Sequence, residues 1–374
     1  MDKEKVRVGL IAAPELPAEI ANRYVEQLPE AFEREIDDSV TWEVEMVVDP
    51  LTGAAENVDK IIEKAAELRN GEDWGYAICL TDLPIFDNSS IVAADISKKH
   101  YIAQLSVPSF GWLPIKKRMR KAVIQIMNEL YNGSRLENND HKVKKNFTGD
   151  MLQRQFPLTK VKRISPNDEH KDIETRYIVI PKINGEVRLL MGMTQANRPW
   201  SIMSSFKKVI AIAFSTGAFA LIFTTLWNLS DILSTLRLSV LSFAAISLMV
   251  IWIITAHNLW ERPSNRHQTH LRHLYNQTTL ITLLLSVLTY YLALFLLFLI
   301  TVIVIVPPEA YNSAVNREGD FTIMQYIRLA WIGTSISTIA GAIGAGLENE
   351  ELVRDITYGY RQKRRYKEVE PKDD

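Results

Sequence analysis

The chain has 374 residues, a formal net charge of -1 and 47% hydrophobic residues, and this composition excludes wholesale disorder. Residues 1–111 carry 10 basic and 22 acidic side chains, residues 112–163 carry 13 and 4, and residues 201–347 carry 8 and 5. An acidic, a basic and an apolar part in succession exclude one uniform soluble domain. The single cysteine, Cys79, excludes an internal disulfide and a zinc site made of several cysteines.

Residues 1–132 alternate between Val- and Ile-rich runs and amphipathic stretches. Strands are expected at 6–12, 41–49, 76–82, 91–97 and 102–108, and helices at 18–35, 55–70 and 113–131. This alternation predicts a cytoplasmic α/β domain with a mixed, mainly parallel sheet in a three-layer arrangement. The short spacing between the strands of 91–108 favours antiparallel pairing there. We expect residues 1–132 to fold without the remainder of the chain.

Two further segments are expected before the apolar part. Residues 133–175 lose periodicity and are rich in Asn, Lys and Arg, so they are interpreted as a basic linker. Residues 176–200 begin with RYIVIPKINGEVRLLMG, in which Asn184-Gly185 is the preferred pair for a two-residue turn. The pattern predicts a β-hairpin that precedes the membrane.

Four apolar runs, at about 208–229, 234–256, 278–306 and 323–346, are each long enough to cross a bilayer as a helix. They predict an all-α transmembrane domain of four helices within 205–347, followed by a charged cytoplasmic tail at 348–374. Basic residues gather before the first run, between the second and third, and after the fourth. By the positive-inside rule, both termini are cytoplasmic and the protein is a multi-pass protein of the cell membrane.

The interiors of the runs contain little that indicates transport. The middle of each run lacks Asp, Glu and Lys, and Arg237 and Arg328 lie near run ends, where they are expected to reach the interface. Ser337, Gly341 and Ala345 are four residues apart in the fourth run. Such a stripe lets helices approach closely, and it offers a packing seam or a contact for a homo-oligomer.

Carboxylates and one imidazole gather at the ends of expected strands. Asp82, Asp87, Asp95 and His100 fall within 19 residues, and carboxylates at strand ends serve acid–base or metal chemistry in many α/β enzymes. These aspartates are the catalytic candidates of the sequence. The alternative is that they cap turns and strand ends and that His100 is a surface residue.

The strongest charge cluster lies at the start of the expected helix 113–131, where Lys116, Lys117, Arg118, Arg120 and Lys121 oppose the helix dipole. Together with Ser109 in the preceding loop PSFGW, they indicate an anion- or lipid-binding site. The anion could be an inner-leaflet lipid headgroup, a phosphorylated metabolite or RNA, or the cations could form an inert solvated face. Anionic lipid is favoured, and nucleic acid is disfavoured because aromatic residues are not interleaved with the charges.

The other motifs examined in the sequence provide little evidence for a metal or cofactor site. His267, His270 and His273 are weak metal candidates, because a helical spacing of three spreads them over a broad face and no carboxylate or cysteine is close in sequence. The phosphate loop, the nucleophile elbow, the His-Glu-x-x-His motif and the glycine-rich dinucleotide fingerprint are absent from the sequence. No cofactor is therefore predicted, and metal binding is not expected.

The runs VGLIAAPELPAE, WEVEMVVDPLT, ICLTDLP and LSVPSFGW, with the basic helix that follows, resemble a family of uncharacterised Gram-positive bacterial membrane proteins. The resemblance is best over the α/β part and implies the same order of domains. Some members carry a methylene-tetrahydrofolate dehydrogenase label. The residues that such a label would need, a glycine fingerprint and a Tyr-x-x-x-Lys stretch after the first strand, are missing from this sequence.

These observations predict a non-enzymatic regulatory, sensing or scaffolding protein whose α/β domain works at the membrane surface. A membrane-anchored small-molecule enzyme that acts near Asp82, Asp95 and the loop 106–117 is the alternative. A transporter or channel subunit is the second alternative, which the scarcity of charge inside the apolar runs disfavours.

Overall fold

The computed structural model describes residues 3–50, 58–87, 90–137, 150–157, 159–166, 172–201, 206–261, 269–316 and 320–345, with six positions between Val353 and Arg364. The chain forms two compact units. The first contains residues 1–196 and 362–374, and the second contains residues 197–361. The first unit is described before the second.

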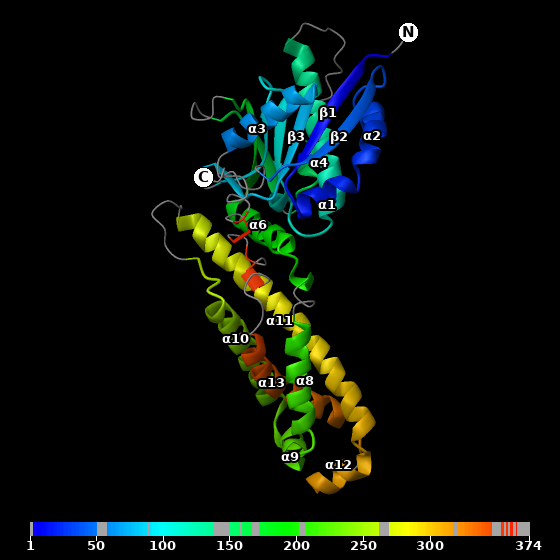
Figure 1. Ribbon diagram of the computed structural model, residues 1–374, viewed down its shortest axis with the longest axis vertical. Coiled ribbons are helices and arrows are strands. Elements are labelled where there is room, and N and C mark those ends of the chain that lie inside the picture. Colours follow the sequence, from blue (N-terminus) through cyan, green and yellow to red (C-terminus); the bar gives the residue numbers. More distant parts are fainter. Residues whose placement is uncertain are drawn as a thin grey trace, which may run out of the picture. The chain divides into compact units, whose positions relative to one another are not determined.

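The first unit alternates strands and helices along the chain (Figure 1). Its elements are β1 (Lys5–Ala12), α1 (Leu16–Asn22), η1 (Val25–Gln27), α2 (Leu28–Glu35), β2 (Thr41–Val48), α3 (Val58–Gly71), β3 (Tyr76–Thr81), β4 (Ile85–Asp87), β5 (Ser90–Ser97), β6 (Ile102–Ser106), η3 (Val107–Phe110), α4 (Ile115–Glu137), α5 (Asp150–Gln153), β7 (Lys160–Ile164), β8 (Thr175–Ile180) and α6 (Lys182–Ala196). The strands expected from the sequence are present with small shifts at their ends.

The strands form one mixed sheet in the order β2-β1-β3-β6-β5-β8-β7, and β4 pairs with β5. The β1–β2, β1–β3 and β3–β6 pairs are parallel. The pairs that β5 makes with β4, β6 and β8, and the β7–β8 pair, are antiparallel. The antiparallel β5–β6 pair agrees with the close spacing of these two runs, and the expectation of a mixed sheet is confirmed.

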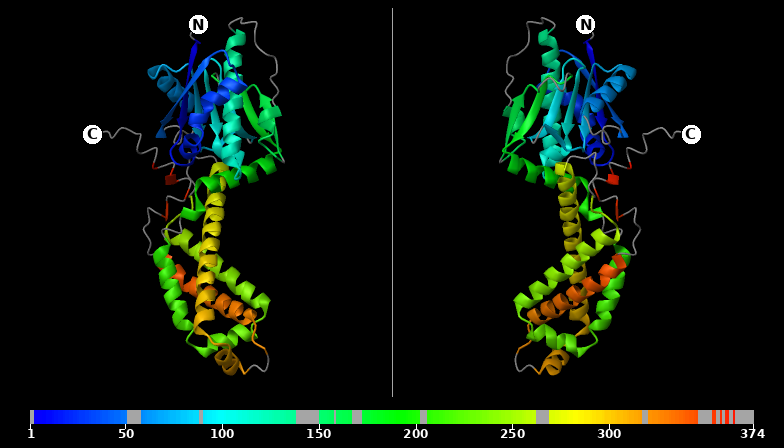
Figure 2. Two further views of the ribbon diagram at one scale, coloured as in Figure 1. Left: turned by 90° about the vertical axis from the view of Figure 1, so that its right-hand side faces the viewer. Right: turned by 90° about the vertical axis from the view of Figure 1, so that its left-hand side faces the viewer.

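Helices cover both faces of the sheet. On one face α3 packs its Ile61, Ile62 and Ala65 against Ala77 and Cys79 of β3. On the other face, Tyr131 of α4 contacts Trp42 of β2 and Tyr76 of β3, and Phe32 of α2 contacts Trp42. Successive side chains of a strand point to opposite faces, so these contacts define a three-layer unit. In Figure 2 the helices lie on both sides of the strands.

The hairpin expected at 176–200 is wrong. Thr175–Ile180 form strand β8, but the chain then continues as helix α6 from Lys182 to Ala196, so Asn184-Gly185 lies in the first turns of a helix. A Cβ on Gly185 would lie 3.2 Å from the Ile91 Cδ1, and one on Gly192 would lie 2.1 Å from the Pro108 carbonyl oxygen. These two glycines, seven residues apart on one helix face, let α6 approach β5 and η3 closely.

The expected linker at 133–175 is also wrong in part. Helix α4 extends through Glu137, and α5 and β7 lie within the segment. β7 pairs with β8 at the edge of the sheet, and its outward residues Lys160, Lys162 and Arg163 are exposed. Charged residues of this kind protect an edge strand from pairing with another chain. The sheet therefore extends beyond residue 132, the boundary expected for the α/β domain.

The second unit is helical. Its elements are η4 (Pro199–Ser201), α8 (Lys207–Ala220), α9 (Thr224–Ile232), α10 (Thr235–Ala256), α11 (Thr269–Ile305), α12 (Pro308–Val315) and α13 (Ile323–Ala345). Among the described residues, α10, α11 and α13 are long and apolar enough to cross a membrane, and α8 with α9 adds a fourth crossing if the pair counts as one. The helix that carries the third apolar run begins before the run: α11 starts at Thr269, and its first nine residues are mostly polar.

The first apolar run is not a continuous helix. α8 ends at Ala220 and α9 begins at Thr224, with a bend of 91° between them. Phe223 has extended backbone angles, and the Trp227 indole Nε1 donates a hydrogen bond of 2.8 Å to the Leu221 carbonyl. This bond occupies a carbonyl that a continuing helix would have used. The run expected at 208–229 is thus a broken segment.

The bend places α9 beside α12, at the end of this unit where α11 ends and α13 begins (Figure 2). The Trp227 and Tyr311 rings stack at 6.1 Å, and the Ser230 and Tyr311 hydroxyls lie 3.0 Å apart. The Arg328 guanidinium of α13 donates to the carbonyls of Ser230, Asp231 and Leu233 at the end of α9. A cation at a helix carboxyl end is favourable, so Arg328 caps α9.

The small residues of α13 form a seam inside this unit. A Cβ on Gly217 of α8 would lie 1.9 Å from the Ser337 Oγ, and one on Gly341 would lie 2.4 Å from the Tyr290 hydroxyl of α11. Ser337, Gly341 and Ala345 are all buried by the same chain. The packing seam expected from the sequence is present, but it is intramolecular. These three residues are therefore not available for the oligomer contact that the sequence suggested.

Candidate functional site

Two of the three aspartates singled out in the sequence meet at one arginine. The Arg176 Nε of β8 lies 2.7 Å from the Asp95 Oδ1 of β5, and its Nη1 lies 3.6 Å from the Asp87 Oδ2 at the end of β4. Arg176 and Asp95 are both fully buried. A carboxylate that is inaccessible and engaged by a guanidinium is a poor general base. This geometry favours a structural role for Asp95.

Asp82 lies elsewhere, at the carboxyl end of β3, and only 1% of its surface is exposed. This edge of the parallel strands is where α/β proteins commonly bind ligands. The serine hydroxyls near this edge form hydrogen bonds within the loops. The Ser106 Oγ donates to the Leu83 carbonyl at 2.7 Å, and the Ser109 Oγ donates to the Ser106 carbonyl at 2.7 Å. Ser109 is buried and its hydroxyl is used within the loop, so the structure does not present Ser109 at the surface; its role in anion binding stays a prediction.

Among the described residues, the candidate histidines do not form one cluster with the candidate aspartates. The His100 Nε2 lies 3.4 Å from the Asp172 Oδ1, and Asp172 also pairs with Lys99 at 2.7 Å. His270 and His273 are exposed near the start of α11, and His267 lies outside the described residues. Within the described part of the chain there is no group of three or more His, Cys, Asp or Glu side chains placed to hold a metal ion.

The five cations at the start of α4 separate into two kinds. Lys117 and Lys121, four residues apart, are exposed, and Lys116 and Arg120 are partly buried. Arg118 is turned inward, and its Nη1 donates a hydrogen bond of 2.9 Å to the Phe110 carbonyl. The first turn of α4 contains no acidic residue. The exposed face at the start of α4 is therefore cationic, whereas Arg118 forms a hydrogen bond to the loop that precedes the helix.

A second guanidinium, from a residue the sequence did not single out, joins Arg118. The Arg188 Nη1 of α6 lies 3.4 Å from the same Phe110 carbonyl oxygen, and its Nη2 donates to the Pro157 carbonyl. The Arg188 side chain also lies over the Phe156 ring, 5.2 Å from its centroid. Burial, and next the nearby charge of Arg118, lower the pKa of Arg188 to about 10. Burial also lowers the pKa of Arg118.

We call Arg118 and Arg188 the guanidinium pair. In the described part of the chain, no salt bridge joins either member to a carboxylate. Two cations that share one carbonyl in a partly buried place repel each other, and an anion would relieve this repulsion. The pair is thus a place where two positive charges meet without a carboxylate partner among the described residues.

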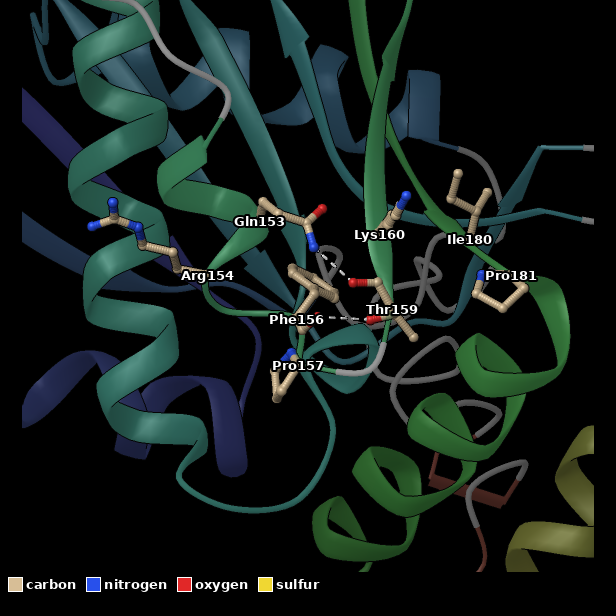
Figure 3. Close-up of a pocket in the computed structure, with 8 residues that line it drawn as sticks. All are labelled: Gln153, Arg154, Phe156, Pro157, Thr159, Lys160, Ile180 and Pro181. Carbon is tan, nitrogen blue, oxygen red and sulfur yellow. Dashed lines mark hydrogen bonds between the residues drawn. The ribbon is translucent and has the colours of Figure 1, made fainter.

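Figure 3 shows a pocket of about 580 Å³, two of whose lining residues, Phe156 and Pro157, contact Arg188 of the guanidinium pair. It lies between the α5–β7 connection and the β8–α6 connection, and its lining residues are Gln153, Arg154, Phe156, Pro157, Thr159, Lys160, Ile180 and Pro181. The Gln153 Nε2 donates to the Thr159 carbonyl at 2.7 Å, and the Thr159 Oγ1 donates to the Phe156 carbonyl at 3.2 Å. These bonds fix the wall that carries Phe156. The pocket contains none of the three candidate aspartates.

Sequence reasoning missed Arg176, Arg188 and Lys160. Arg176 begins the run RYIVI, and an arginine next to a buried strand is a signal for a buried ion pair. Arg188 was assigned to a hairpin, so its position beside Arg118 could not be inferred. Lys160 was assigned to a linker.

Comparisons of this chain with protein-family models, with curated proteins and with solved structures gave no match. The resemblance to a family of Gram-positive membrane proteins therefore stays a prediction, and the function rests on the geometry alone.

Proposed function

We propose that the protein is a four-span protein of the cell membrane with both termini in the cytoplasm. Its α/β unit serves as a non-enzymatic regulatory, sensing or scaffolding module that associates with anionic lipid at the membrane surface. The observation that carries this proposal is the exposed cationic face of Lys117 and Lys121, in a chain that also contains long apolar helices.

The directions of the helices support four spans. Along α8, Ile212, Ala213 and Gly217 lie near Gly344, Gly341 and Ser337, so α8 and α13 are antiparallel. On α10, Ser242 contacts Ser335 and His257 contacts Ala345, so α10 and α13 are parallel. On α11, Tyr290 lies near Gly341 and Val306 contacts Tyr326, so α11 and α13 are antiparallel. The four helices α8, α10, α11 and α13 therefore alternate in direction along the chain, as four successive membrane crossings would.

The exterior of this unit suits lipid. Large apolar side chains from all four long helices are more than half exposed: Phe219 near the end of α8, Leu236 and Phe243 on α10, Leu292 and Val304 on α11, and Ile343 on α13. Soluble proteins rarely expose contiguous apolar surfaces of this kind. Lys207 and Lys208 at the start of α8, and Arg272 near the start of α11, lie at the end of the bundle that we place in the cytoplasm.

Electrostatic attraction to lipid can be tested on residues 1–196. We expect this fragment to bind vesicles of anionic phospholipid at low salt and to dissociate as salt rises, because the Debye length falls from ~30 Å at 0.01 M to ~8 Å at 0.15 M. Each nearby lysine contributes about 1 kcal/mol. The double variant Lys117→Gln and Lys121→Gln should therefore bind roughly 30-fold more weakly in a vesicle sedimentation assay.

The matched control is Lys60→Gln with Lys64→Gln. These lysines are also four residues apart on a helix, but they lie on α3 among Asp59, Glu63 and Glu67, on the opposite side of the sheet. The control should bind nearly as well as the unchanged fragment. Equal losses in the two double variants would contradict a specific basic face, and unchanged binding of the Lys117 and Lys121 variant would contradict the lipid proposal.

A further inference from the structure

The pocket of Figure 3, which we call the α5–α6 pocket, combines apolar walls with positive charge. The Phe156 ring, Pro157, Ile180 and Pro181 provide the apolar lining, and Phe156 is fully buried. Arg154 and Lys160 are the charged residues of the lining, and the lining contains no carboxylate. Both cations are exposed at the surface of the unit. The chemistry of the lining therefore suits a ligand with one apolar part and one anionic part.

The guanidinium pair adds to this charge from behind one wall. Arg188 lies over the Phe156 ring and donates to the Pro157 carbonyl, so it directly contacts two lining residues. Arg118 lies beside it at the Phe110 carbonyl. Phe110 and Phe156 pack with their ring centroids 4.8 Å apart, which links the wall to the loop before α4. Arg188 thus contacts the wall of the pocket directly, and Arg118 lies behind it.

The charge is uncompensated within the described residues. Salt bridges in this part of the chain join Glu129 to Arg163 and Glu186 to Lys182, and neither involves Arg118, Arg154, Lys160 or Arg188. A half-buried arginine held beside another arginine is costly unless an anion accompanies it. An external anion is the simplest source of the missing charge.

We propose that the α5–α6 pocket binds a small organic anion. Its apolar group lies against Pro157, Ile180 and Pro181, and its phosphate or carboxylate group is held by Lys160, while the guanidinium pair adds positive charge from behind the wall of Phe156 and Pro157. The site differs from the lipid-binding face of Lys117 and Lys121 in its residues, so either proposal can fail without the other. The anion is a free metabolite or the headgroup of a lipid whose first carbons enter the pocket.

The test uses the full chain in nanodiscs of zwitterionic lipid, with phenyl phosphate as the probe and isothermal titration calorimetry as the readout. Phenyl phosphate should bind at least about tenfold more tightly than inorganic phosphate or benzyl alcohol, because only phenyl phosphate uses both the apolar walls and the cations. Equal affinity for phenyl phosphate and inorganic phosphate would overturn the role of the pocket. Absence of phenyl phosphate binding in the millimolar range would overturn the proposal as a whole.

Two variants on strand β7 assign the site. Lys160→Glu should weaken phenyl phosphate binding about tenfold, because it reverses a charge in the lining. Lys162→Glu makes the same change two residues along the same exposed strand face and outside the lining, and it should leave the affinity within about twofold. Equal effects of the two changes would show general surface attraction and overturn the site. Both lysines are exposed, so neither change threatens folding.

A third variant and a competition arm refine the result. Arg188→Gln should weaken binding by a factor similar to that of Lys160→Glu, whereas Arg188→Lys should retain part of the affinity; unchanged binding by Arg188→Gln would remove the guanidinium pair from the site. Adding phosphatidic acid to the nanodisc then distinguishes the sources. Displacement of phenyl phosphate supports a lipid headgroup as the occupant, and undiminished binding supports a free metabolite.

Discussion

A fragment that ends at Asn132 should not unfold cooperatively, whereas a fragment that ends at Ala196 should. The shorter fragment contains β1 to β6 and most of α4, but it lacks β7, β8 and α6. It retains two buried carboxylates whose cationic partners lie beyond its end: Asp95 contacts Arg176, and Glu129 contacts Arg163. It also loses the buried side chains of Tyr177 and Val179.

The cost of this truncation comes from both faces of the sheet. Removing the guanidinium partner of the fully buried Asp95 typically costs about 3–5 kcal/mol, and a whole domain is stable by only about 5–15 kcal/mol. Tyr177, on the face opposite Arg176, donates a hydrogen bond to Glu129, and burial followed by the charge of Glu129 raises the pKa of this phenol above its usual range. The comparison is a urea titration followed by circular dichroism. A cooperative transition for residues 1–132 would contradict the assignment of β7 and β8 to this core.

Replacement of Arg176 by methionine should destabilise the α/β unit by about 3–5 kcal/mol. The change keeps an apolar stem of similar length but removes the guanidinium from Asp95, which lies in the centre of the sheet between β6 and β8. Gln104, the neighbour of Asp95 on β6, is fully buried, and among the described residues its amide has no hydrogen-bond partner, Asp95 included.

Cys79 provides the readout in the full chain. It is the only cysteine, its side chain is fully buried on β3, and burial raises the pKa of its thiol above the usual value. The thiol should therefore react with an alkylating reagent only when this unit opens. A loss of about 3–5 kcal/mol corresponds to a rise of roughly two to four orders of magnitude in the opened population, and hence in the labelling rate.

Two further variants separate the charge from the packing. Arg163→Met removes a cation that also pairs with a buried carboxylate, but its side chain is 56% exposed, so we expect about 1 kcal/mol or less. The double variant Arg176→Met with Asp95→Leu should recover much of the stability, because it leaves no buried charge at this pair. A labelling rate for Arg176→Met close to that of the unchanged protein would contradict the role of the buried pair.

The sequence was informative where local pattern decides the structure. The buried strands β1, β3, β5 and β6 follow from runs of Val, Ile and Ala, and α3 follows from its helical spacing of apolar residues. Helices α10, α11 and α13 follow from the length of their apolar runs. The break between α8 and α9 was not predicted, because the composition stays apolar through Leu221–Phe223 and no local residue marks the end of a helix there.

The errors arose where long-range packing overrides a local signal. Asn184-Gly185 is a strong turn signal, yet Gly185 serves to bring α6 close to Ile91 and Val179. The prediction of the candidate site was the least accurate, because the residues that form the site are far apart in the sequence. Arg118 and Arg188 are 70 residues apart and Asp95 and Arg176 are 81 apart, so no spacing motif joins them. Only the cationic character of the start of α4 was predicted. In the structure Lys117 and Lys121 are exposed, whereas Arg118 is turned inward and lies beside Arg188 of α6.

The four-span topology is the central claim, and protease accessibility tests it most directly. Short cleavable tags are placed at each end of the chain and in the connection between α12 and α13, and a protease is added outside intact cells. The helices α8, α10, α11 and α13 alternate in direction along the chain. Four spans of alternating direction predict that the tag between α12 and α13 is cut while both end tags are protected. If α8 and α9 only enter and leave the same side, three spans remain and the two ends lie on opposite sides. Cleavage of either end tag would contradict the account.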